Sequence, residues 1–85
     1  MEIKYTKKFL KKFKKLKSSE KAQVYKTEQL FKENLKHPSL RLHRITNDLY
    51  NLWSISVNMK IRILVYEENN FLNVIFLDIG GHEIY

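Results

Sequence analysis

The sequence contains no cysteine, one proline and only two glycines. Without cysteine the chain has no disulfide framework and no thiolate nucleophile or metal ligand, so packing or a partner must stabilise it. Glycine-rich phosphate loops and nucleophile elbows are also absent. No apolar run approaches the roughly 20 residues that a membrane helix requires, and the start of the chain has no apolar signal-peptide segment. We therefore expect a cytoplasmic chain without membrane association.

Acidic residues are scarce in the first part of the chain. Residues 1–36 carry twelve lysines against four acidic residues, whereas the remainder is close to neutral. A field this one-sided attracts polyanions, or an acidic protein segment, through long-range steering and counterion release. The alternative is a merely soluble lysine-rich surface, because charge asymmetry alone specifies no partner.

The first half of the sequence predicts one strand and two helices. Residues 2–6 alternate between apolar and polar, which indicates a short opening strand, and Thr6 can cap the helix that follows. An apolar stripe over residues 9–16, surrounded by lysines, predicts an amphipathic helix of about three turns. Ser18-Ser19-Glu20 supplies an N-cap and a first-turn carboxylate for a second helix, which should end before His37-Pro38.

The second half changes to β-branched and aromatic residues in short runs. These runs predict four strands, near Leu40 to Ile45, Leu52 to Val57, Ile61 to Tyr66 and Phe71 to Ile79. Breaks such as Thr46-Asn47-Asp48 separate them, and the short connections indicate antiparallel hairpins. The last strand is apolar on both faces, so we expect it to be central. The predicted fold is one α+β domain over residues 1–85, with an N-terminal strand and a helical hairpin packed on a curved, mainly antiparallel sheet, in the order β-α-α-β-β-β-β.

Several polar side chains are placed to act on RNA. Cleavage without metal needs a group that takes the 2′-hydroxyl proton, a cation for the phosphorane and a proton donor for the leaving oxygen. Alternation in the strand near residue 40 puts Arg41 and His43 on one face, where they can line a groove. Arg62 projects from a middle strand. His82 and Tyr85 follow the two glycines, where a turn can bring them back across the sheet.

Each of these residues also has a purely structural interpretation. An isolated histidine such as His43 is more often a surface or satisfied core residue. Arg62 can pair with a glutamate of its own strand, and Trp53 and Tyr66 fit a core or groove wall better than a base-stacking platform. A metal site built from the three histidines is disfavoured, because no cysteine or spaced carboxylate completes a familiar ligand set.

Three stretches of the sequence support a more specific interpretation. They read HPSLRLH over residues 37–43, WSISVN over residues 53–58 followed by IRI over residues 61–63, and LDIGGHEIY over residues 77–85. Their order and spacing, together with the helical hairpin, resemble the RelE/ParE toxin superfamily, specifically the RelE and YafQ-like toxins. The resemblance covers essentially the whole chain. It implies a RelE-like fold and a type II toxin that cleaves mRNA on the ribosome.

The resemblance also implies roles for individual residues. His43 is similar to a YafQ-type histidine that assists proton transfer, and Arg62 to a RelE-type arginine that contacts the scissile phosphate. His82 becomes the candidate general acid or phosphate ligand, and Tyr85 takes the place of a terminal aromatic residue that orients the nucleotide. The residues expected to bind RNA are Lys7, Lys8, Lys11, Lys12, Lys14, Lys15, Arg41, Arg44 and Lys60.

The implied reaction is attack by the 2′-hydroxyl in the ribosomal A site, without metal or cofactor. The implied partners are the ribosome, through its rRNA and A-site mRNA, and a cognate antitoxin with an acidic binding segment, in an assembly that can extend to a heterotetramer. Two alternatives stay open, namely a ParE-like inhibitor of DNA gyrase and a non-catalytic RNA-binding or inactive homologue. The second rests on a departure: YafQ-like proteins carry a further histidine and an aspartate where this chain has Ser56-Val57 and Lys60-Ile61.

Overall fold

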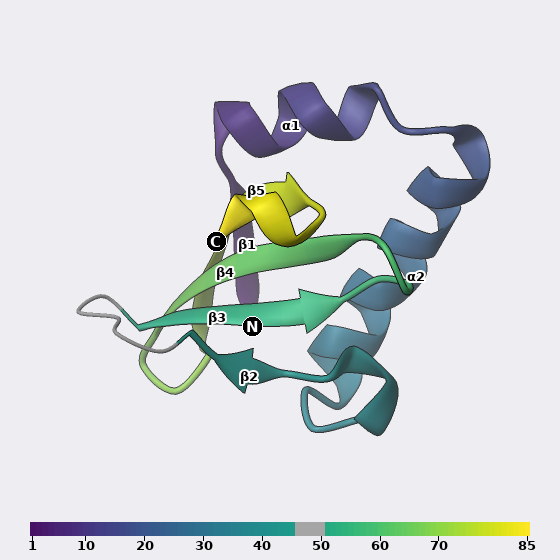
Figure 1. The fold of residues 1–85 in the computed structure, drawn as a ribbon. Helices are drawn as coiled ribbons and strands as arrows, with labels where there is room; N and C mark the ends of the chain where they lie inside the picture. Colours follow the sequence, from purple (N-terminus) through teal and green to yellow (C-terminus); the bar gives the residue numbers. More distant parts are fainter. Residues whose placement is uncertain (46–50) are drawn as a thin grey trace.

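Strands and helices follow one another along the chain in the predicted order. The computed structural model describes residues 1–45 and 51–85 (Figure 1). Its elements are β1 (Glu2–Tyr5), α1 (Lys7–Lys14), α2 (Ser18–Glu33), the 3₁₀-helix η1 (Pro38–Leu40), β2 (His43–Arg44), β3 (Leu52–Ser56), β4 (Arg62–Glu68), β5 (Asn73–Gly80) and the 3₁₀-helix η2 (His82–Ile84). The predicted α+β class is confirmed. The predicted break at Thr46-Asn47-Asp48 lies outside the described residues.

The strands form one five-stranded sheet in the order β1-β5-β4-β3-β2. β1 pairs with β5 in parallel, and the other neighbours are antiparallel. A parallel pair needs a crossover connection, and the helical hairpin begins it here. The prediction that the last strand is central is wrong in detail, because β5 is interior but second from the edge, and β4 occupies the middle. An apolar pattern on both faces reports that a strand is covered, and it does not specify the strand's rank in the sheet.

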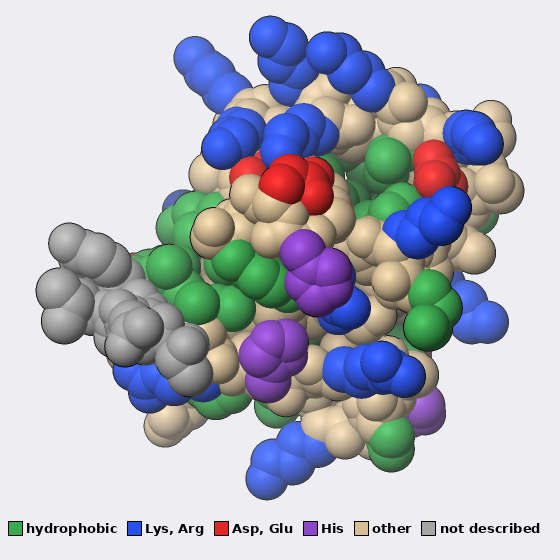
Figure 2. Space-filling view, in the orientation of Figure 1, with side chains coloured by type: hydrophobic (Ala, Val, Ile, Leu, Met, Phe, Trp, Pro, Cys, Tyr) green, Lys and Arg blue, Asp and Glu red, His purple; other side chains and the backbone are tan. Residues whose placement is uncertain are grey.

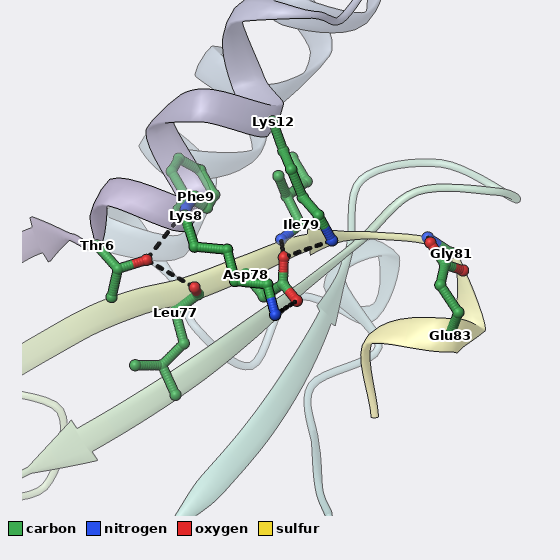
Figure 3. A network of polar contacts seen from close by, with 9 residues as sticks. All are labelled: Thr6, Lys8, Phe9, Lys12, Leu77, Asp78, Ile79, Gly81 and Glu83. Atoms are coloured by element: carbon green, nitrogen blue, oxygen red, sulfur yellow. Dashed lines mark hydrogen bonds and ion pairs between the residues drawn. The ribbon is translucent and has the colours of Figure 1, made fainter.

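The cap of α1 also ties the helix to the sheet. Thr6 Oγ1 accepts the Phe9 N–H at 3.0 Å and donates to the Leu77 carbonyl at 2.7 Å (Figure 3). The predicted Thr6 cap is therefore confirmed, with a second contact to β5. The helix is shorter than the predicted three turns, since it ends at Lys14. Bonds of i→i−3 type from Lys15 and Leu16 close its last turn.

α2 begins one residue earlier than a serine N-cap at Ser18 would place it. Lys17 is the N-cap, and Ser18 is already helical, so the predicted serine N-cap is wrong. The first-turn carboxylate is confirmed, because Glu20 Oε1 accepts the backbone N–H of Lys17 at 2.9 Å. The helix ends at Glu33, ahead of His37-Pro38 as predicted.

The predicted strand over Leu40–Ile45 is mostly absent. Pro38–Leu40 forms η1, because the fixed φ of proline suits the first turn of a helix. Arg41 then takes a left-handed conformation with φ 47°, and only His43–Arg44 pair with β3. The alternation that set Arg41 beside His43 on one strand face therefore does not exist. The other three predicted strands differ from the observed ones by one or two residues at their ends.

α2 covers one face of the sheet and leaves the opposite face of β3 and β4 without an α-helix (Figure 1). On the covered face Phe31 packs against Phe76, with ring centroids 6.0 Å apart, and Ile55 and Ile63 are completely buried. Because side chains alternate along a strand, Ser54, Ser56 and Arg62 point to the other face. That open face receives the C-terminal residues.

Candidate active site

The four predicted catalytic residues come together on the sheet face opposite α2. His43 lies on β2, Arg62 begins β4, His82 belongs to η2 and Tyr85 follows it. The Tyr85 ring lies edge-on to both histidines, at centroid distances of 6.5 Å from His43 and 6.0 Å from His82. Arg62 Nη2 lies 3.3 Å from His82 Nε2. Figure 2 shows histidine side chains close together near the middle of this face.

The C-terminal turn is what returns His82 and Tyr85 to the sheet. β5 ends at Gly80, which pairs with Arg62 on β4. A Cβ at Gly80 would lie 2.9 Å from the Ile84 side chain, which is buried, so the absence of a side chain lets η2 fold closely onto the strand. Glu83 Oε1 accepts the Gly81 N–H at 2.9 Å and closes the turn (Figure 3). The glycines are thus needed here because they have no side chain to clash with η2, since neither has a positive φ.

Ser54 is a site residue that the sequence reasoning missed. Its side chain is completely buried in β3, opposite His43 in the strand register. The Ser54 hydroxyl hydrogen-bonds the Tyr85 hydroxyl and so holds the terminal ring between the two histidines. The available signal was a small polar residue between Trp53 and Ile55, at a position whose side chain faces away from the core.

The contact between Arg62 and His82 constrains the histidine. A guanidinium only donates, so a hydrogen bond at this site requires His82 Nε2 to accept, which places the proton of the neutral ring on Nδ1. The suggested pairing of Arg62 with Glu67 or Glu68 does not occur among the described residues, because these glutamates lie at the far end of β4. Arg62 Nε is buried and has no hydrogen-bond partner in the described part of the chain.

His43 is held in a state that suits a general base. Its Nδ1 lies 3.0 Å from the carbonyl oxygen of Arg41. Since a carbonyl only accepts, Nδ1 donates, and Nε2 of the neutral ring is left as the proton acceptor. The left-handed turn at Arg41 aims that carbonyl at the ring. Arg41 therefore contributes through its backbone, while its side chain is exposed.

The lysines of α1 divide into two groups. Lys7, Lys11, Lys14 and Lys15 are exposed, and blue side chains cover this helix in Figure 2. Lys8 and Lys12 instead reach the buried carboxylate of Asp78 on β5, at 3.2 Å and 2.8 Å (Figure 3). Two of the six lysines predicted to bind RNA thus have an internal partner.

Asp78 joins α1 to β5 just before the C-terminal turn. Burial acts to raise the pKa of this carboxyl, but the hydrogen bonds from Lys12, from the Ile79 N–H and from Lys8 outweigh it. The pKa of Asp78 is therefore below its usual value, and the group is a stable anion at neutral pH. The pKa of Glu83 is lowered as well, because its carboxylate accepts backbone N–H groups at the turn.

The remaining predicted RNA-binding residues are exposed near the site or in turns. Arg44 donates to Asn51 Oδ1 at 3.1 Å, and Lys60 lies in the turn between β3 and β4. A hollow of about 400 Å³ adjoins the catalytic candidates and is lined by His43, Arg44, Ile45 and Tyr85. Its size allows a nucleotide to lie against Tyr85.

The described residues were also searched for metal-binding clusters and for membrane-spanning helices. Within residues 1–45 and 51–85, no three histidine, cysteine or acidic side chains are arranged to hold a metal ion. No helix in the same residues has the length and apolar content that crossing a bilayer demands.

Comparison with solved structures identifies the fold. The chain is similar to the YoeB/ParE toxin from Agrobacterium tumefaciens, with a TM-score of 0.78 at 9% identity, over 96% of this chain and 99% of that chain. It is similar to YafQ from E. coli strain BL21(DE3), with a TM-score of 0.78 at 13% identity, over 98% of this chain and 94% of that one. It is also similar to a chain of the archaeal RelE–RelB complex from Pyrococcus horikoshii OT3, with a TM-score of 0.76 at 9% identity, over 93% of this chain and 91% of that chain.

Comparison of the sequence alone gives no such relatives, since no family model and no curated protein matches it. The chain nevertheless has the fold of the RelE/ParE toxins, and the resemblance predicted from the sequence is confirmed at the level of the fold. Identities this low carry the fold alone, so the activity has to be argued from the site.

Proposed function

We propose that this protein is the toxin of a type II toxin–antitoxin system and cleaves mRNA on the ribosome by metal-independent 2′-hydroxyl attack. The observation that carries this proposal is the convergence of His43, Arg62, His82 and Tyr85 on one open face of the sheet. They supply the base, the phosphate-binding cation and the acid that the reaction requires, together with an aromatic ring beside them.

The proposed reaction begins with proton transfer from the 2′-hydroxyl to His43 Nε2. The 2′-oxygen then attacks the adjacent phosphorus, and Arg62 stabilises the charge that develops on the phosphoryl oxygens. The bond to the 5′-oxygen breaks, and protonated His82 donates a proton to that leaving oxygen. The products are a 2′,3′-cyclic phosphate and a free 5′-hydroxyl. For this step the phosphate must come between Arg62 and His82, in place of their present contact.

Tyr85 and Ser54 orient the nucleotide in this scheme. The Tyr85 ring offers a stacking surface beside the hollow of about 400 Å³, and its hydroxyl is held by Ser54. The ribosome supplies the rest of the alignment, a contribution that can reach about 7–11 kcal/mol. We therefore expect free RNA to be cut poorly. This alignment compensates for the histidine and the aspartate that YafQ-like proteins have and this chain lacks.

The exposed lysines and arginines account for binding to the ribosome. Lys7, Lys11 and Lys14 of α1 and its C-cap residue Lys15 are exposed to solvent, where they can neutralise rRNA phosphates. The second partner is an antitoxin with an acidic binding segment. Among the similar structures, RelE is seen with RelB and YafQ with DinJ, which supports a partner of this kind.

Primer extension on ribosome-bound mRNA after induction of the protein tests the proposal. We expect new 5′ ends at defined codons with the wild-type chain and none with an Arg62→Ala His82→Ala double variant that retains its fold. Intact mRNA in both samples would rule the nuclease out. A parallel DNA gyrase supercoiling assay identifies the ParE-like alternative, because inhibition there without mRNA cleavage would replace our proposal.

A further inference from the structure

Asp78 is a buried, ionised group that the proposed reaction does not use. The residue is 4% exposed, and its carboxylate contacts Lys12 Nζ at 2.8 Å, Lys8 Nζ at 3.2 Å and the Ile79 N–H at 2.8 Å (Figure 3). Both lysines belong to α1. Burying a carboxylate among ammonium groups costs hydration free energy, whereas the directional bonds that result fix how the two bonded elements lie relative to each other.

The Asp78 carboxylate lies on the same face of the sheet as Arg62. In the register of β4 and β5, Arg62 pairs with Gly80 and Leu64 pairs with Asp78. Because side chains two residues apart on a strand share a face, Asp78 is on the open side. The register shifts just after Leu64, so Phe76 can point to the α2 side although it is only two residues before Asp78. In Figure 2, acidic side chains lie between the lysines of α1 and the histidines.

The C-terminal turn begins two residues after Asp78. His82 opens η2, and the Glu83 carboxylate accepts the Gly81 N–H at 2.9 Å. Backbone hydrogen bonds, from its own N–H and from Gly81, lower the pKa of Glu83, and the positive charge of Lys12 lowers it further. Lys12 therefore acts on both sides of the junction, through its bond to Asp78 and through its charge near the turn.

The proposed function assigns α1 to rRNA, through its exposed lysines. Two sets of polar contacts attach this helix to β5. Thr6 donates to the Leu77 carbonyl at 2.7 Å, and Lys8 and Lys12 bind Asp78 further along the helix. Apolar packing also holds α1 on the sheet, but it is not directional. The Asp78 cluster therefore connects the helix that binds rRNA to the strand that leads into the catalytic turn.

We propose that Asp78 is a positioning residue, which fixes the placement of His82 and Tyr85 relative to α1. Lys12 is its principal partner, because it is closer than Lys8 and its side chain is less exposed, at 39% against 67%. Asp78 itself touches neither RNA nor the reacting atoms. Its effect on cleavage rests on the proposed function, whereas the connection between α1 and the turn does not.

Single-turnover cleavage at increasing ribosome concentration tests the effect on the reaction. Asp78→Asn should lower the rate at saturation about tenfold, because alignment is lost, and should leave the Kd for the ribosome within about twofold, because the exposed lysines remain. Lys12→Met should behave in the same way. Lys12→Arg keeps a cation beside Asp78 and should recover most of the rate. Lys26→Met, an exposed change on α2, is the matched control and should alter neither quantity.

A double variant separates positioning from stability. Asp78→Leu Lys12→Met replaces the buried ions by apolar side chains, a change that often costs no stability. Its urea midpoint should therefore lie above that of Asp78→Asn, whereas its cleavage should remain as slow. A cleavage rate that follows the urea midpoint across all these variants would overturn the proposal, because the cluster would then act only through the folded fraction.

Amide hydrogen exchange, followed by NMR, tests the connection without RNA. The N–H groups of Gly81, Ile84 and Tyr85 are hydrogen-bonded within the turn, so their exchange rates report its order. In Asp78→Asn these rates should rise about tenfold more than that of Ile55, which lies in β3. An equal rise at all four amides would mean a uniform loss of stability and would contradict a positioning role.

The two measurements also distinguish this inference from the nuclease. A wild-type chain that leaves ribosome-bound mRNA intact would disprove the proposed function, and the exchange rates would then decide whether Asp78 holds the turn. A wild-type chain that cleaves, together with an Asp78→Asn variant that cleaves equally fast, would remove the positioning role and leave the nuclease standing.

Discussion

The two sides of the sheet differ in how their surfaces are built. On the α2 side, the surface depends on the helical hairpin, whose buried and exposed residues follow a helical repeat. On the open side, His43, Ser54, Arg62 and Tyr85 meet across strands that are distant in sequence. Local periodicity thus indicates which residues of the helical hairpin are buried and which are exposed, whereas the grouping of the candidate catalytic residues requires the sheet register and the C-terminal turn.

The largest expected effect is on the rate of mRNA cleavage, and it comes from replacing residues on the open side of the sheet. Arg62→Ala or His82→Ala should each lower the rate of mRNA cleavage about 10²- to 10³-fold, because each removes a group that acts on charge in the transition state. Single-turnover primer extension on ribosome-bound mRNA measures the rate, and urea unfolding checks the fold. Lys26→Ala, an exposed change on α2, is the control. A wild-type rate in either variant would remove that residue from the mechanism.

Asp78 joins α1 to β5, and its replacement should weaken that connection. Asp78→Asn should lower the free energy of unfolding by about 1.5–3 kcal/mol at pH 7, because the charge-assisted bonds from Lys8 and Lys12 are lost. Urea denaturation measures the difference. Lys60→Ala, which changes an exposed lysine away from Asp78, should leave stability within about 0.5 kcal/mol.

The difference in stability between the wild type and the Asp78→Asn variant should depend on pH. The pKa of Asp78 is lowered in the folded state, so its stabilisation is present above the unfolded value of about 3.9 and is lost as the pH falls through the folded value. The stability difference between wild type and Asp78→Asn should therefore shrink below about pH 4. A difference that stays constant down to pH 2 would contradict the assignment of the effect to this carboxylate.

Ser54 tests whether the open face depends on one buried hydrogen bond. Ser54→Ala should slow cleavage roughly five- to tenfold, in line with a hydrogen bond worth about 1 kcal/mol, because Tyr85 loses its only contact through the hydroxyl among the described residues. Tyr85→Phe removes the same bond, so the double variant should be no slower than either single one. Ser56→Ala is the matched control, since that hydroxyl donates to the Asn58 carbonyl instead. Additive losses in the double variant would rule out a shared role.

The smallest effects distinguish the lysines within α1. Lys11→Ala should weaken binding of a single-stranded RNA and lower the slope of log K against log salt by about 0.7, the value expected for one phosphate contact. Lys8→Ala should change that slope less and lower stability instead, because Lys8 pairs with Asp78. Anisotropy titrations over a range of salt concentrations, with urea unfolding in parallel, measure both. Identical behaviour of the two variants would contradict the division of the lysines.

The comparison also explains which predictions succeeded. The Thr6 cap and the Glu20 carboxylate were readable because each depends on a neighbour three residues away. The end of α2 was readable because proline disfavours helical geometry in the residue before it. The strand predicted around residue 40 was wrong because a strand depends on a distant pairing partner, which its local pattern does not reveal. A pattern of alternating polarity over six residues fits a strand, but Pro38 starts a 3₁₀ turn there, and the pairing partner is in register only from His43 onward.

The sequence by itself determined the α+β class, the amphipathic hairpin, the basic N-terminal part and the candidate residues His43, Arg62, His82 and Tyr85, because composition and short-range spacing encode these properties. Only the tertiary structure revealed that Ser54 holds Tyr85 and that Asp78 takes up two of the lysines. Each of these depends on which side chains meet across the sheet and between packed elements. Such contacts are set by register and packing over the whole chain.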